Sequence, residues 1–173
     1  MALGLAQIQD LFTLAKNVLS TVKDNLPGLL EAFRGLEKRE VLVGVPADNT
    51  DREETMTNAT LAYIHDNGSP ARNIPARPFM EPGIKSAKAK IAKQFGFAAK
   101  RFISGGAEEA SRDLNKVGLI AQAAIRAKIN EGIGPELAKS TLAARRKRGR
   151  TGTKPLVDTA QLRNSINYVV REK

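Results

Sequence analysis

The sequence predicts an α+β fold, with long amphipathic helices packed on a small, mostly antiparallel sheet and extended loops between the elements. Apolar residues recur at three- and four-residue spacing over long stretches, the period of a helix with one buried face. Two short runs instead carry β-branched or alternating apolar residues, which is typical of strands. The long stretches are residues 5–26, 84–102 and 107–130, and the short runs are residues 40–46 and 166–171.

The N-terminal part is predicted to be helical up to the first strand. The amphipathic stretch 5–26 ends at Pro27, because proline lacks a backbone donor and breaks a helix. A short second helix is expected over residues 28–36, followed by the strand 40–46, which Pro46 closes. The polar segment after it carries an acidic cluster that we expect to be solvated, formed by Asp51, Glu53 and Glu54.

A helix capped by Thr57 or Asn58 is predicted to run to about His65 and to stop at Asn67-Gly68. An extended arm, residues 67–83, follows. Its four prolines cannot donate backbone hydrogen bonds and disfavour helix in the residues before them. Large apolar groups on such an arm must be buried, either by the chain's own core or by a neighbouring molecule. The prolines are Pro70, Pro75, Pro78 and Pro82, and the apolar groups are Ile74, Phe79 and Met80.

The C-terminal half is predicted to begin with two long helices, separated at Ser104-Gly105-Gly106. The first presents lysines on its outer face, and the second carries small residues that allow another helix to approach. A short helix is expected over 136–146, with Pro135 at its start, and then a flexible basic loop, residues 144–155. Because two strands alone make no stable sheet, further pairing is expected, within the chain or between subunits.

Composition and charge limit the possible functions. The 173 residues fit one domain, and the absence of cysteine excludes disulfides, thiolate nucleophiles and cysteine-bound zinc. No apolar run is long enough to cross a bilayer, so no membrane partner is expected. The net charge of +10 is uneven. Residues 1–83 carry 8 Lys+Arg and 11 Asp+Glu, whereas residues 84–173 carry 20 and 7, which indicates a polyanionic partner for the C-terminal half.

No group of residues suggests catalysis. His65 is the only histidine and stands beside Asp66, but adjacent helical residues point apart and no nucleophile accompanies them. No calcium loop, P-loop or dinucleotide fingerprint is present. We therefore predict a protein that is not an enzyme and that has no catalytic residue, metal or cofactor.

The strongest electrostatic feature is a run of cations near residue 148. Such a run binds nucleic acid phosphates without sequence preference, docks on an acidic protein, or stays solvated. No aromatic residue near it would stack on bases, which disfavours single-strand recognition. The candidate contacts with DNA or an acidic partner are Arg145, Arg146, Lys147, Arg148 and Arg150.

Two segments make the chain resemble the neck and tail-completion proteins of tailed bacteriophages, also called virion morphogenesis or tail-component proteins. They are IPARPFM, residues 74–80, and KPLVDTAQLRNSI, residues 154–166, within a resemblance that covers about residues 40–172. The resemblance implies an α+β domain over 39–173, preceded by an N-terminal helical extension, residues 1–38. It also implies synthesis in the bacterial host cytoplasm and a place in the virion, at the head-tail junction or the proximal end of the tail.

What the resemblance implies about function is a structural role. The chain would form a homo-oligomeric ring around the DNA channel and bind portal, connector, neck or tail proteins, with possible non-specific contact to packaged double-stranded DNA. The alternatives are a tail terminator that caps the tail tube and a sequence-independent DNA-binding module. On this interpretation the arm grips the adjacent subunit, Phe79 is its anchor, and the arginines pair with a neighbour's acidic loop. The expected interface residues are Arg72, Ile74, Arg77, Phe79 and Met80.

Overall fold

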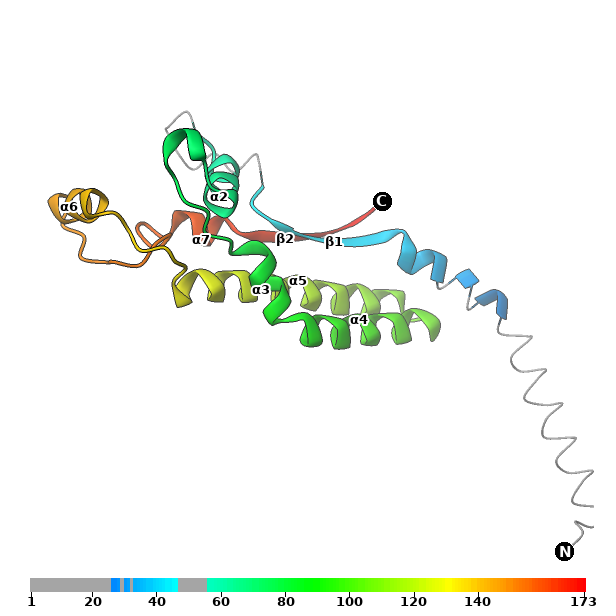
Figure 1. Cartoon of the computed structure of the whole chain (residues 1–173). Coiled ribbons are helices and arrows are strands. Elements are labelled where there is room, and N and C mark those ends of the chain that lie inside the picture. Colours follow the sequence, from blue (N-terminus) through cyan, green and yellow to red (C-terminus); the bar gives the residue numbers. More distant parts are fainter. Residues whose placement is uncertain (1–25, 29, 32, 47–55) are drawn as a thin grey trace, which may run out of the picture.

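The computed structural model describes residues 26–28, 30–31, 33–46 and 56–173 (Figure 1). It confirms the α+β class, with several helices and one small antiparallel sheet. Residues 26–28 are helical, so helical conformation includes Pro27 instead of ending there, and residues 30–31 and 33–37 are helical as predicted. The rest of the predicted N-terminal helix and the acidic cluster of Asp51, Glu53 and Glu54 lie outside the described residues.

The sheet consists of strands β1 (Arg39–Gly44) and β2 (Asn167–Glu172), close to the two predicted runs. The strands are antiparallel, with Arg39 opposite Glu172 and Gly44 opposite Asn167. Within the described ranges no third strand joins them, and the one further bridge pairs Ser69 with Ile74. The additional pairing expected from the sequence is therefore not supplied by this part of the chain.

Helix α5 (Ala107–Glu131) is the centre of the fold, and it spans nearly the predicted residues. It packs against helix α4 (Lys88–Ile103) on one side and against both strands on another, as Figure 1 shows. Its apolar stripe enters two hydrophobic clusters. One contains Ala62, Phe79, Ile125, Ile129, Leu162 and Ile166, and the other contains Ala98, Phe102, Ala110 and Leu114.

Two glycines permit close approaches to this core. A Cβ on Gly118 of α5 would overlap the ring of Tyr168 in β2, so the strand lies directly on the helix at this point. A Cβ on Gly83 would lie 2.7 Å from the Cα of Ile125. The small residues of α5 thus admit a strand, whereas the close helix-helix approach depends on a glycine of the neighbouring helix.

The predicted helix 84–102 is divided in the structure. Helix α3 (Met80–Ser86) ends before Ala87, and α4 begins after it. The hydroxyl of Ser86 donates to the carbonyl of Gly83 at 2.7 Å, a side-chain bond that competes with helical hydrogen bonding. The first turn of α3 takes up the end of the predicted arm, so residues 80–83 are helical and not extended.

The shorter helices were predicted, but some of them begin or end at other residues than expected. Helix α2 (Asn58–Asn67) begins with the Thr57 side chain as its cap and ends at Gly68, both as predicted. Helix α6 (Lys139–Lys147) begins three residues later than predicted. Helix α7 (Gln161–Ser165) has Ala160 at its N-cap and so no capping side chain there. Leu162 and Ile166 belong to the core, and Leu156 packs against it.

A buried carboxylate joins α4 to α5. Asp113, only 2% exposed, forms ion pairs with Arg101 at 2.7 Å and Lys116 at 2.9 Å, and accepts a hydrogen bond from Gln94 at 3.0 Å. The Lys116 hydrogen bond lowers the pKa of the Asp113 carboxyl; burial acts in the opposite direction, and the Arg101 and Lys116 charges and the Gln94 bond lower the pKa further. Because the folded-state pKa is depressed, the ionised carboxylate stabilises the fold above its unfolded value of 3.8.

We expect Asp113→Asn to lower the free energy of unfolding at pH 7 by about 1–3 kcal/mol, since it removes charge-assisted bonds to Lys116 and Arg101. The deficit should shrink as the pH falls below 3.8 and should vanish once the native carboxyl is protonated. Urea unfolding of both proteins across this pH range measures it. The control is Glu108→Gln, which removes an exposed pair with Arg112. Equal stability of D113N and the parent at pH 7 would contradict this role.

Candidate interaction surfaces

The arm folds back on its own chain. Gly68 adopts a positive φ of 79° and Asn73 one of 53°, and between them the 3₁₀ turn Pro70–Arg72 reverses the direction of the backbone. Ser69 and Ile74 close the turn by exchanging two backbone hydrogen bonds, of 2.8 and 3.0 Å. The segment therefore forms a closed turn followed by an irregular return segment, residues 75–79, and does not reach outward as an arm.

Asp66 holds the returning segment against α2. Its Oδ1 accepts hydrogen bonds from the backbone N–H groups of Phe79, at 2.7 Å, and Met80, at 3.1 Å. These are donors at the start of α3, where a helix has no internal acceptors. The N–H of Arg77 also donates to the carbonyl of His65 at 2.8 Å. A carboxylate at the end of one helix thus caps the next.

Two of the five expected interface residues, Phe79 and Arg77, are buried inside the chain, which corrects the prediction made for them, and Met80 is partly buried. Phe79, fully buried, belongs to the first hydrophobic cluster, and Met80 packs against it. Arg77 is 6% exposed and donates to the carbonyls of Pro135 and Glu136, at 2.9 and 3.2 Å. Because the core buries its side chain, Phe79 is an anchor for its own domain and not for a neighbouring subunit.

Arg72 and Ile74 remain at the surface. Arg72 is exposed on the 3₁₀ turn, and Ile74 is half-buried beside the bridge to Ser69. Both stay candidates for contact with another molecule. Their predicted pairing partners, the acidic residues 51, 53 and 54, lie outside the described residues.

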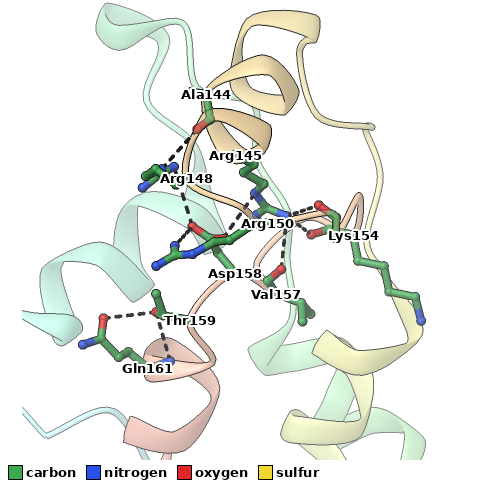
Figure 2. A network of polar contacts seen from close by, with 10 residues as sticks. Ala144, Arg145, Arg148, Arg150, Lys154, Val157, Asp158, Thr159 and Gln161 are labelled. Carbon is green, nitrogen blue, oxygen red and sulfur yellow. Dashed lines mark hydrogen bonds and ion pairs between the residues drawn. The ribbon is translucent and has the colours of Figure 1, made fainter.

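The first four residues of the expected basic loop 144–155 belong to α6, and the residues after them form turns and irregular backbone. Arg145 lies near the end of α6 and is only 5% exposed. Its guanidinium donates to the carbonyls of Gly152, Lys154 and Val157, at 2.9, 3.0 and 3.1 Å (Figure 2). Arg145 therefore shapes the loop that follows it and is not available for contact with DNA, which corrects the prediction for this residue.

Asp158 collects the other arginines of the segment. Its carboxylate lies 2.7 Å from Arg150, 3.7 Å from Arg145 and 3.8 Å from Arg148, as Figure 2 shows. Arg148 and Arg150 keep 56% and 37% of their side chains exposed, so they can also reach an external group. Arg146 and Lys147 are exposed on α6. The structure thus separates one shape-determining arginine from four accessible cations.

Arg145, Arg148 and Arg150 line a cleft of about 500 Å³ between α2, α6 and the loop before α7. Arg77 and His65 line the same cleft, although the sequence places them in a different segment. Sequence reasoning missed this convergence, because 68 residues separate Arg77 from Arg145 and only the fold brings them together.

The outer face of the sheet is a second exposed surface. Leu42 and Val169 lie opposite one another in the register and are 39% and 50% exposed. They border an apolar hollow of about 420 Å³, which Val45 and Pro46 extend beyond the strand. The Glu40–Arg171 ion pair, at 2.7 Å, flanks Leu42 and Val169 on the same face. Val43 and Tyr168 line the hollow as well, and they also contact the interior, since Tyr168 lies on Gly118 of α5 and Val43 packs against the first hydrophobic cluster.

Neither a metal site nor a membrane span is found in the described ranges. No three carboxylate or histidine side chains there gather as ligands for an ion. No helix of the described residues combines the length and the hydrophobicity needed to cross a bilayer. His65 lines the arginine cleft. The only hydroxyl groups among the cleft residues are those of Thr141 and Thr159.

Comparison with protein-family models, curated proteins and solved structures finds no significant match to this chain.

We expect Asp66→Ala to destabilise the protein by about 0.5–2 kcal/mol, the usual effect of removing a helix cap. The amides of Phe79 and Met80 lose their acceptor, so their hydrogen exchange should accelerate. Asp66→Asn keeps an acceptor oxygen and should be less destabilising. Chemical denaturation and amide exchange provide the measurements.

The matched control is Asn67→Ala, which removes only a local bond to the carbonyl of Tyr63. If D66A and N67A lost the same stability, and the two amides exchanged at the parental rate, the capping role of Asp66 would be wrong.

Proposed function

We propose that this chain is a structural protein of the tailed-phage virion, a neck or tail-completion protein that forms a ring of identical subunits where tail and head join. It acts by assembly and not by catalysis, in the virion. The resemblance carried by residues 74–80 and 154–166 supports the virion role. The structure supports self-assembly, through a surface that the sequence alone did not identify.

The unfinished sheet is the observation that carries the proposal. Two strands rarely form a stable sheet by themselves, and here only one face packs on a helix. The opposite face exposes Leu42 and Val169, and neither strand has a second neighbour within the described residues. Unpaired backbone groups at a sheet edge readily accept a strand from another chain. A second copy of this chain both covers the apolar face and extends the sheet.

The helical residues before β1 carry a second set of exposed apolar side chains. Leu26, Leu30 and Phe33 have the spacing of one helical face and are 47%, 50% and 53% exposed. A stripe of this kind on a soluble domain marks a protein contact. In a ring, this stripe would pack on the neighbouring subunit, and the sheet would form the main subunit interface.

DNA contact inside the ring channel has its own support on α4. Lys88, Lys90, Lys93 and Lys100 form no ion pair with any described residue, and α4 contains no acidic residue. Phosphate contacts of this kind are independent of sequence and weaken steeply with salt. The same lysines favour the alternative function, a DNA-binding module. That alternative predicts duplex binding by a chain that stays monomeric.

We expect the double substitution Leu42→Glu with Val169→Lys to abolish the oligomer while the monomer stays folded. Both side chains are exposed, and the new charges face each other across the strands, where opposite charges are favourable. Burying them against a second subunit would instead be unfavourable. Sedimentation velocity of the purified full chain measures the mass, and circular dichroism checks the fold.

The control is Leu119→Lys, which places a charge at an apolar side chain that is 51% exposed on α5. It should leave the oligomer unchanged. A parent protein that is monomeric at all concentrations, or a double variant with the parental mass, would contradict assembly through the sheet.

A further inference from the structure

The arginine cleft carries more positive charge than its own residues neutralise. Four arginines line it, and Asp158 is the single carboxylate among the lining residues. That one carboxylate is shared among Arg145, Arg148 and Arg150. The lining therefore has an excess of three positive charges at neutral pH, before any contribution from His65.

Two of these arginines are buried, where an excess of charge is most unfavourable. Arg77 meets only the carbonyls of Pro135 and Glu136, and no carboxylate of the described chain forms an ion pair with it. Burial lowers the pKa of the Arg77 guanidinium, the direction expected for a cation removed from water without a counter-charge. Arg145 donates hydrogen bonds to three backbone carbonyls and lies 3.7 Å from the carboxylate of Asp158, which it shares with Arg148 and Arg150. Buried charges are normally paired, so this arrangement favours an anion from outside.

The arginines divide into a fixed floor and an adaptable mouth. Backbone carbonyls hold Arg77 and Arg145 in place, whereas Arg148 and Arg150 are substantially exposed and contact a carboxylate through their ends. Guanidinium groups bind carboxylates with two parallel hydrogen bonds, which gives such contacts strength and direction. A second carboxylate can therefore bind at the mouth beside Asp158.

The walls favour a peptide over a nucleic acid. Leu61, Leu137 and Leu156 line the cleft, together with the polar groups of Thr141, Thr159 and Gln161; Leu162 lies behind them in the core. Phosphate contacts on a duplex use cations and other polar groups, whereas this cleft places aliphatic side chains beside its arginines. An acidic side chain flanked by aliphatic residues matches both the charge and the walls.

We propose that this cleft binds an acidic segment of a partner protein, with a glutamate or aspartate carboxylate held by Arg148 and Arg150 and aliphatic neighbours against the leucines. The site lies within one chain. It therefore goes beyond the proposed ring and holds whether or not the ring forms.

The test measures binding of a fluorescein-labelled peptide of glutamate and leucine to the full chain by anisotropy. Arg148→Gln with Arg150→Gln should weaken binding by at least about tenfold, since it removes the charge-assisted bonds at the mouth. The control is Arg146→Gln with Lys147→Gln, which removes the same charge from adjacent residues outside the cleft and should change affinity less than about threefold. Circular dichroism confirms that each variant is folded.

Further arms separate the possible ligands. A peptide with glutamine in place of glutamate should not bind, and inorganic phosphate should compete only weakly. Three results would each overturn the proposal. They are an equal loss of affinity in R148Q/R150Q and R146Q/K147Q, no binding of the acidic peptide at low salt, and displacement of the peptide by a short DNA duplex. The L42E/V169K protein should still bind the peptide, which distinguishes failure of this site from failure of the ring.

Discussion

The backbone of α5 is approached closely at two points along one face, and the rest of the fold depends on this constraint. Tyr168 of β2 lies on Gly118, where no Cβ stands in the way, and Gly83 of α3 lies against Ile125, about two helical turns further along. The side chains of Gln122 and Arg126 then hold the carbonyl of Ile166, at 2.8 and 2.7 Å, just before β2 begins. The sheet and α3 are thereby fixed to one helix, which buries the inner face of the sheet and leaves the outer face open.

The same constraint decides where the arm goes. Because α3 is pressed on α5, the chain leaving α2 must return to that point, and the turn at residues 68–74 with the Asp66 cap provides the return. Phe79 then enters the core. The same returning segment places Arg77 in the arginine cleft and Phe79 in the core beside Ile125. One segment therefore contributes to both the core and the cleft. The apolar sheet face and the cationic cleft are distinct surfaces that share no lining residue.

The elements that local pattern determines were predictable. Helical spacing located α5 to within a residue or two, Thr57 and Gly68 marked the ends of α2, and the runs that became β1 and β2 read as strands. The errors concern residues whose role depends on distant neighbours. The sequence around Phe79 does not indicate whether this side chain is buried in its own core or against another subunit. Arg145 is one of several consecutive cations, and nothing in the sequence distinguishes it from the others. Its burial follows from carbonyls that the loop presents only after folding. Asp66 gave no local sign of a cap, because the helix it caps begins fourteen residues later.

Assembly through the open sheet is the central claim, and electron microscopy of the purified full chain tests it most directly. Closed rings are predicted, in which the face carrying Leu42 and Val169 lies against the next subunit and a strand of one sheet extends the other. Single subunits at every concentration would contradict the claim. So would rings in which both side chains remain exposed to solvent and the sheet stays two-stranded.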